Sequence, residues 1–192
     1  MVLSARFTDG LIFATQLHAN QTRKGSGVPY IAHLLGVASI ALEHGANEDE
    51  AIAALLHDAI EDQGGAPTRE EICRRFDDTV TAIVDGCTDT DITPKPPWRQ
   101  RKEAYIAHIS KASTSVLLVS ASDKLHNARS ILNDYRVLGD AVWERFKGGK
   151  EGTLWYYRSL VKAFLTAGAT PLVNELERTV DELERLAGIK SG

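Results

Sequence analysis

Residues 48–62 read EDEAIAALLHDAIED, a run in which apolar residues recur every three or four positions. This spacing predicts an amphipathic helix. The same period recurs along the rest of the chain, and the period-two alternation typical of strands is nearly absent, so we predict an all-α fold of about eight to ten helices. The segments expected to be helical are 7–21, 33–45, 48–62, 70–86, 104–113, 116–135, 154–168 and 170–188.

Residues at the ends of these segments supply start and stop signals for helices. Asn47 and Thr8 are expected to precede helices, and Thr68 with Glu71 has the spacing of a capping box. Glycines follow several periodic segments, as they commonly do at helix ends. These stop signals are Gly45, Gly64, Gly65, Gly139 and Gly168.

Length and composition favour one compact domain over residues 1–192, with segment 170–188 as a docked amphipathic C-terminal helix. The 22 basic and 26 acidic residues give a net charge of −4, which disfavours DNA or RNA as a partner. No apolar run approaches the roughly 20 residues of a membrane-spanning helix. The two cysteines lack C-x-x-C spacing, and the chain starts without a signal-peptide pattern, so we expect a cytoplasmic protein. The oligomeric state stays open.

His57, Asp58, Glu61 and Asp62 place charge inside the apolar run that opens this section. An acidic helix face usually points to solvent. Here apolar residues flank His57 and Asp58 on nearly every side, so these two side chains should be enclosed. A buried carboxylate needs an ionic partner or a metal, since its desolvation is costly.

His33 and Asp123 are further isolated polar residues in apolar segments. Each alone has an ordinary explanation, because a lone histidine is commonly a core residue and a lone aspartate commonly pairs with a neighbour such as Lys124 or Arg129. Two imidazoles and two carboxylates together form a mixed nitrogen and oxygen donor set. Such a set suits Mn²⁺ or Fe²⁺ with open coordination positions.

The order His33, His57-Asp58, Asp123 resembles the H…HD…D pattern of the HD-domain phosphohydrolases, which are all-helical and metal-dependent. Segments 18–45, 51–65, 70–89 and 122–132 further resemble the hydrolase domain of the RelA/SpoT family, with a weaker likeness at 155–164. The resemblance implies an HD-domain helical bundle that acts as a stand-alone small alarmone hydrolase of the stringent response. Its reaction would be removal of the 3′-pyrophosphate of guanosine tetra- or pentaphosphate by a metal-activated water. Two positions depart from the family's pattern. Leu34 stands where the family usually has proline, and VSAS at residues 119–122 stands where the family has a more basic segment.

The resemblance also implies residue roles. One Mn²⁺ per chain would be held by His33, His57, Asp58 and Asp123. Glu61 is expected to be the general acid/base and Asp62 the assisting carboxylate. The expected substrate-binding residues are Arg23, Lys24, Asn127, Lys124 and Arg129, of which the last two could instead pair with acids such as Glu61.

Some features keep two interpretations. The proline-rich segment 93–102 predicts a surface loop before a further helix, and its basic side chains either bind 5′-phosphates or are simply solvated: Lys95, Arg99, Arg101 and Lys102. Tyr156 and Tyr157 are expected in the core. Alternative functions are an NADPH 2′-phosphatase, a nucleotidase, or a scaffold that only holds a metal or a nucleotide. Substrate panels and metal analysis would separate them.

Overall fold

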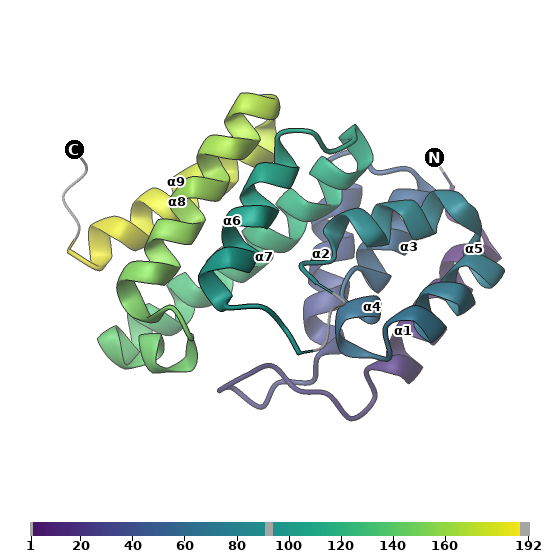
Figure 1. Cartoon of the computed structure of the whole chain (residues 1–192), viewed down its shortest axis with the longest axis horizontal. Coiled ribbons are helices and arrows are strands. Elements are labelled where there is room, and N and C mark those ends of the chain that lie inside the picture. Colours follow the sequence, from purple (N-terminus) through teal and green to yellow (C-terminus); the bar gives the residue numbers. More distant parts are fainter. Residues whose placement is uncertain (1, 91–93, 189–192) are drawn as a thin grey trace. The chain divides into compact units, whose positions relative to one another are not determined.

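The computed structural model describes residues 2–90 and 94–188, so Thr93 of the predicted loop and both extremes of the predicted domain lie outside the described residues. The all-α prediction is confirmed: the described residues form nine α-helices and one 3₁₀ helix, and their only β pairing is an isolated bridge between Thr22 and Pro29. None of these helices is long and apolar enough to cross a membrane. The helices (Figure 1) are α1 Ala5–Leu17, α2 Ile31–Glu43, α3 Glu48–Leu56, α4 Ala59–Asp62, α5 Ala66–Cys87, α6 Trp98–Ile109, α7 Thr114–Leu138, η1 Gly139–Arg145, α8 Gly149–Ala167 and α9 Pro171–Leu186.

The chain divides into two compact units, and each is described by itself. The first contains Met1–Lys95 with Ala112–Ser122, and the second contains Pro96–Lys111 with Asp123–Gly192. Helix α7 therefore contributes residues to both units. A single domain over residues 1–192 stays a prediction beside this division.

Helix α3 is the centre of the first unit and packs against α1, α2 and α5. Its alanines are fully buried, and their small side chains let neighbouring helices approach closely. Asn47 caps α3 as predicted: its side chain accepts from the Glu50 N–H at 3.0 Å, while the Glu50 carboxylate accepts from the Asn47 N–H at 2.7 Å. This capping box fixes where the central helix begins.

The predicted continuous helix 48–62 is wrong in one respect, because the chain turns at His57 and Asp58 between α3 and α4. Nδ1 of the His57 imidazole is hydrogen-bonded to the Ala54 carbonyl oxygen, at 2.8 Å. In a continued helix that carbonyl would accept the N–H of Asp58. The His57 side chain thus competes with the backbone hydrogen bonds of the helix at the point where α3 ends.

Two predicted helix starts are also wrong. Helix α1 begins before Thr8, since the Ser4 hydroxyl caps it by accepting from the Arg6 N–H at 3.1 Å. Helix α5 begins at Ala66, directly after Gly65 with φ 63°, a conformation that glycine adopts without strain. Thr68 therefore lies inside the helix and donates to the Gln63 carbonyl instead of capping.

Helix α5 is kinked at Asp77, a non-glycine residue with φ 81°. Its Oδ1 accepts from the N–H groups of Thr79 at 2.8 Å and Val80 at 3.3 Å, so Asp77 caps the second half of the helix. Arg6 from α1 holds the other carboxylate oxygen at 2.7 Å. These contacts offset the strain of the positive φ.

In the second unit, α8 packs against α6, α9 and η1. Helix α9 buries an apolar stripe formed by Leu172, Leu176, Val180 and Leu183, and Arg158 of α8 pairs with Glu184 and Asp181 of α9. Tyr156 and Tyr157 of α8 are buried, as predicted.

The predicted loop 93–102 is wrong over its second half, because α6 already begins at Trp98, immediately after Pro97. Arg99 of this helix lies over the Trp155 ring at 3.2 Å and is 2.7 Å from Glu103, and Lys102 lies over the Tyr156 ring at 4.9 Å. These contacts between cations and aromatic rings explain why basic residues begin a helix here.

Candidate active site

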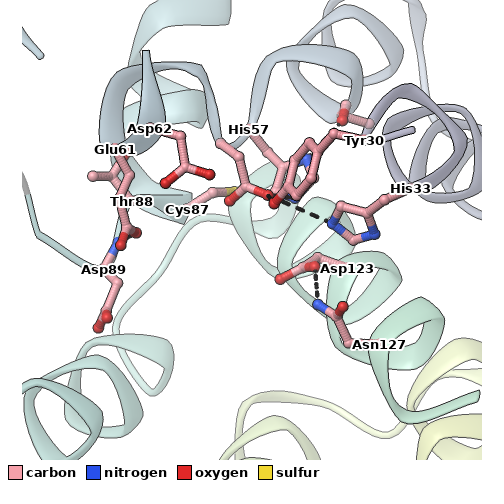
Figure 2. Close-up of polar contacts among 12 residues, drawn as sticks. Tyr30, His33, His57, Glu61, Asp62, Cys87, Thr88, Asp89, Asp123 and Asn127 are labelled. Atoms are coloured by element: carbon pink, nitrogen blue, oxygen red, sulfur yellow. Dashed lines mark hydrogen bonds and ion pairs between the residues drawn. The ribbon is translucent and has the colours of Figure 1, made fainter. Parts of the chain in front are cut away.

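Three of the four predicted metal ligands come together in the first unit. His33 projects from the first turn of α2, and His57 with Asp58 forms the turn after α3. Figure 2 shows the side chains of His33 and His57. Oδ2 of Asp58 lies 3.5 Å from Nε2 of His33 and 3.1 Å from Nε2 of His57. One ligand atom from each of the three residues lies within 4.8 Å of the others, so this cluster could hold a metal ion.

The hydrogen bond from His57 to Ala54 determines which imidazole nitrogen faces the cluster. Since Nδ1 must carry the proton to donate to a carbonyl, Nε2 of the neutral ring presents a lone pair toward Asp58. A lone pair 3.1 Å from a carboxylate oxygen is repulsive unless a cation or a proton lies between them. The two imidazole rings are almost completely buried, with 1 and 2% exposure. A buried donor set of this kind fits a divalent metal, and the Ala54 carbonyl would then be the outer partner of His57.

Asp123, the fourth predicted ligand, lies on α7 in the second unit. Its Oδ1 accepts from Nδ2 of Asn127 at 2.5 Å, one helical turn on, and its Oδ2 is 2.6 Å from Nζ of Lys124 (Figure 2 shows the first of these contacts). The pKa of Lys124 is raised well above its usual value, because burial lowers it but the charge of Asp123 and the nearby tyrosines Tyr105 and Tyr156 outweigh that effect. Membership of Asp123 in the metal centre stays a prediction.

Arg129, one of the predicted substrate-binding residues, pairs with Glu175 of α9. This contact is an ion pair within the second unit. Glu175 is an acid, so this contact agrees with the alternative that Arg129 pairs with an acid, and a role of Arg129 in substrate binding stays a prediction.

The two predicted catalytic carboxylates lie on α4, and each is held by its own partners. Oε1 of Glu61 is 2.7 Å from Nζ of Lys95, and its Oε2 accepts from the Asp89 N–H at 3.3 Å. Oδ2 of Asp62 accepts from Nε2 of Gln21 at 2.8 Å. The pKa of Asp62 is raised, first by partial desolvation of its carboxylate and then by the nearby charge of Asp58, although the residue as a whole is exposed.

The predicted nucleotide-binding loop lies between α1 and α2 and is folded back on itself. The Arg23 N–H donates to the Val28 carbonyl at 2.7 Å, and the isolated bridge joins the same two sides of the loop. Lys24 is exposed in the turn, whereas Arg23 is half-buried with its guanidinium 5.8 Å from the centre of the Tyr30 ring. The Tyr30 hydroxyl donates to Oδ2 of Asp58 at 2.5 Å. A single side chain, Tyr30, therefore separates Arg23 from the metal cluster.

Reasoning from sequence did not assign roles to Tyr30, Gln21 and His18, and it did not foresee that Lys95 contacts Glu61. Tyr30, Gln21 and His18 all lie within the segment 18–45 that carries the family resemblance. Their only signal in the sequence was their position in that segment, because a tyrosine, a glutamine and a lone histidine have no spacing pattern of their own.

The described residues form an all-α protein with a cluster of His33, His57 and Asp58 that could hold a metal ion, and comparison with known families gives the class. The family described as HD domain matches residues 10–153. The chain therefore belongs to the HD domain family, as the H…HD…D pattern predicted.

Relatives with assigned names narrow the class further. The chain is 39% identical over 122 residues to guanosine-3′,5′-bis(diphosphate) 3′-pyrophosphohydrolase MESH1 of Danio rerio, and 40% identical to the protein of that name in Xenopus tropicalis. Each match covers 62% of this chain and 65% of the relative, so the chain spans slightly less than two thirds of these relatives. It is also 33% identical over 132 residues to the bifunctional (p)ppGpp synthase/hydrolase SpoT of Escherichia coli K12, covering 66% of this chain and 18% of that protein.

Two solved structures share the fold. One, described as a metazoan ortholog of SpoT that hydrolyses ppGpp and plays a role in starvation responses, matches with a TM-score of 0.76 and 25% identity over 99% of both chains. The other, lmo0812 of Listeria monocytogenes EGD-e, matches with a TM-score of 0.72 and 27% identity, covering 80% of this chain and 99% of that one.

Proposed function

We propose that this chain is a metal-dependent hydrolase that removes the 3′-pyrophosphate of guanosine tetra- or pentaphosphate, giving GDP or GTP and pyrophosphate. The observation that carries the proposal is the juxtaposition of His33, His57 and Asp58 in a chain whose relatives include guanosine-3′,5′-bis(diphosphate) 3′-pyrophosphohydrolases. The chain's membership of the HD domain family supports the same reaction class.

His33, His57, Asp58 and Asp123 would hold one Mn²⁺ per chain. A divalent metal supplies two services to such a reaction, since it makes a water more acidic and withdraws charge from a phosphoryl oxygen. Mn²⁺ is the metal we propose because the donor set is two neutral imidazoles and two carboxylates without a thiolate.

Glu61 and Asp62 would manage the proton and the attacking water. Glu61 is half-buried, with 19% of its side chain exposed, so it can reach both the site and solvent protons. We assign it as general acid/base, while Asp62, whose carboxylate accepts from Gln21, orients the water. A site that only held a metal would need the ligands but neither of these carboxylates.

Positive charge for the polyanionic substrate would come from the loop between α1 and α2 and from α7. Arg23 offers a planar guanidinium to the purine, and Lys24, exposed at the turn, offers an ammonium to phosphate. Asn127 would contact the ribose or a water, and Lys124 and Arg129 are the remaining candidates.

We further propose a cytoplasmic enzyme that acts on a small nucleotide without DNA, RNA or membrane as a partner. The net charge of −4 and the cysteines Cys73 and Cys87, which are not in a disulfide in the described residues, support this setting.

Product analysis tests the proposal. The protein is incubated with guanosine tetraphosphate and Mn²⁺, and the products are separated by ion-exchange chromatography. Equal amounts of GDP and pyrophosphate are expected, and addition of a chelator should stop the reaction. Release of single orthophosphate groups, or faster turnover of NADPH or deoxynucleotides in a parallel panel, would contradict the proposed substrate.

A further inference from the structure

We propose that His18 is a positioning residue that holds two carboxylates of the site at once, Asp58 through Tyr30 and Asp62 through Gln21. His18 ends α1 and is 2% exposed. The inference rests on the proposed function for its effect on turnover, but its effects on metal binding and on side-chain positions do not depend on the substrate.

The first connection runs from the His18 ring to the metal cluster. The His18 and Tyr30 rings are stacked, with centroids 5.2 Å apart and an interplanar angle of 16°. The Tyr30 ring also meets the His33 ring edge-on, with centroids 5.4 Å apart. The ring is thus fixed in orientation while its hydroxyl donates at 2.5 Å to Oδ2 of Asp58. That oxygen is the one that faces both imidazoles, so Tyr30 holds the carboxylate in the rotamer that forms the cluster.

The second connection runs from the His18 nitrogen to the catalytic carboxylate. Nδ1 of His18 lies 2.7 Å from Oε1 of Gln21, which also accepts from Nε2 of Gln63. With its oxygen committed to these donors, the Gln21 amide must present Nε2 to Asp62, at 2.8 Å. A flipped amide would set its oxygen against the carboxylate, so His18 selects the amide orientation that holds Asp62.

The protonation of His18 agrees with both connections. Burial lowers the pKa of His18, which favours the neutral imidazole. Its Nε2 is buried and has no hydrogen-bond partner among the described residues. A protonated ring would leave an N–H there without an acceptor, whereas a neutral ring with its single proton on Nδ1 donates to Gln21 and leaves no donor unsatisfied.

Two substitutions at His18 separate the connections. His18→Phe keeps an aromatic ring to stack on Tyr30 but removes the donor to Gln21. His18→Asn keeps a donor close to the Nδ1 position but removes the ring. Tyr30→Phe and Gln21→Leu are the matching changes in the first and second connection. The matched control is His44→Phe, since His44 also ends a helix and donates its backbone N–H to the carbonyl four residues earlier, but it caps the end of α2 opposite to Tyr30.

The Mn²⁺ dissociation constant, measured by isothermal titration, reports the first connection without any turnover. Loss of an outer partner of a metal ligand typically costs about 10-fold or more in affinity. We expect weakening of about that size in Tyr30→Phe and His18→Asn, and values within about 2-fold of the wild type in His18→Phe, Gln21→Leu and His44→Phe.

The turnover number at saturating Mn²⁺ and crystal structures report the second connection. We expect His18→Phe and Gln21→Leu to lower turnover about 10-fold, as for loss of one positioning contact, with the Asp62 carboxylate displaced from Gln21 in the crystal. His44→Phe should retain turnover. Melting temperatures of all variants show whether each is folded.

The proposal is overturned if His18→Phe and His18→Asn change metal affinity and turnover equally, because that is the behaviour of a residue needed only for packing. It is also overturned if folded Tyr30→Phe binds Mn²⁺ as tightly as the wild type. Should the wild type fail to hydrolyse guanosine tetraphosphate while Mn²⁺ affinity and side-chain positions respond as expected, the proposed function fails and the positioning role of His18 stands.

Discussion

Nζ of Lys95 lies 2.7 Å from Oε1 of Glu61, so a cation that follows α5 in the sequence holds the carboxylate proposed as general acid/base. The Asp89 N–H contacts the other oxygen at 3.3 Å. These two contacts fix the direction of the carboxylate before any substrate arrives. Lys95 is 45% exposed, so its ammonium is also available to a phosphate group that enters the site.

Replacing Glu61 by glutamine tests the proton role. Glu61→Gln keeps the shape and an oxygen for Lys95, but the amide cannot take up a proton. General acid/base groups typically contribute 10²–10⁴-fold, so we expect turnover to fall by about 100-fold or more while the Mn²⁺ dissociation constant is unchanged. Steady-state kinetics and isothermal titration measure the two quantities.

His57→Ala is the contrasting variant, because it removes a proposed ligand and should lose metal binding and hydrolysis together. Full turnover in Glu61→Gln would remove the acid/base assignment. Loss of Mn²⁺ binding in Glu61→Gln would instead indicate that Glu61 is a metal ligand.

The helical architecture could be predicted from sequence because hydrophobic periodicity is a local property. The cap at Asn47 was found for the same reason, since a capping box lies within four residues. The break at His57 and Asp58 was missed, because the His57 side chain competes for the Ala54 carbonyl and periodicity does not record such a hydrogen bond.

The site itself depended on contacts between segments distant in sequence. The identities of His33, His57 and Asp58 followed from their isolation among apolar residues and from the family resemblance. Partners could not be predicted in the same way: Arg129 meets Glu175, which lies 46 residues further along. Likewise, only the folded chain brings Tyr30 to Asp58. Long-range pairing of polar side chains follows helix packing, which a single sequence does not encode locally.

Arg23 gives a second functional prediction. If its guanidinium stacks on the purine, Arg23→Ala should raise the Michaelis constant by about 10-fold and change turnover by less than about 2-fold. This is the result expected when a contact that binds the substrate and the transition state equally well is removed. Arg23→Lys keeps the charge without the plane and should resemble the alanine variant. Mn²⁺ affinity should not change in either variant, which separates this role from a disturbance of Tyr30. An unchanged Michaelis constant would count against nucleotide binding by this loop.

Glu71 gives a prediction for acid stability. Hydrogen bonds from Arg74 and then Arg75 lower the pKa of Glu71 from 4.5 to about 2. A carboxylate whose pKa is depressed by folding stabilises the folded state above its unfolded pKa, and this stabilisation is lost as the pH falls through the folded value. The melting temperature of Glu71→Gln should therefore lie below that of the wild type at neutral pH, and the difference should shrink as pH falls from 4.5 toward 2. High salt should also shrink it, because the ion pairs of Glu71 are open to solvent, with 32% of its side chain exposed. A pH-independent difference would exclude the ion pairs as its cause.

Gly86 on α5 tests how closely two helices of the first unit approach. A Cβ at this position would lie 2.5 Å from Cγ2 and 3.0 Å from Cγ1 of Val116, a β-branched side chain with little freedom to move. Gly86→Ala gains about 1 kcal/mol of helix propensity. Overpacking of this kind costs about 1–3 kcal/mol, so we expect the free energy of unfolding in urea to fall. Val116→Ala removes the clashing methyl groups, and the double variant should therefore be more stable than the sum of the two single effects by at least about 0.5 kcal/mol. Strict additivity would show that α5 and α7 do not meet at this pair.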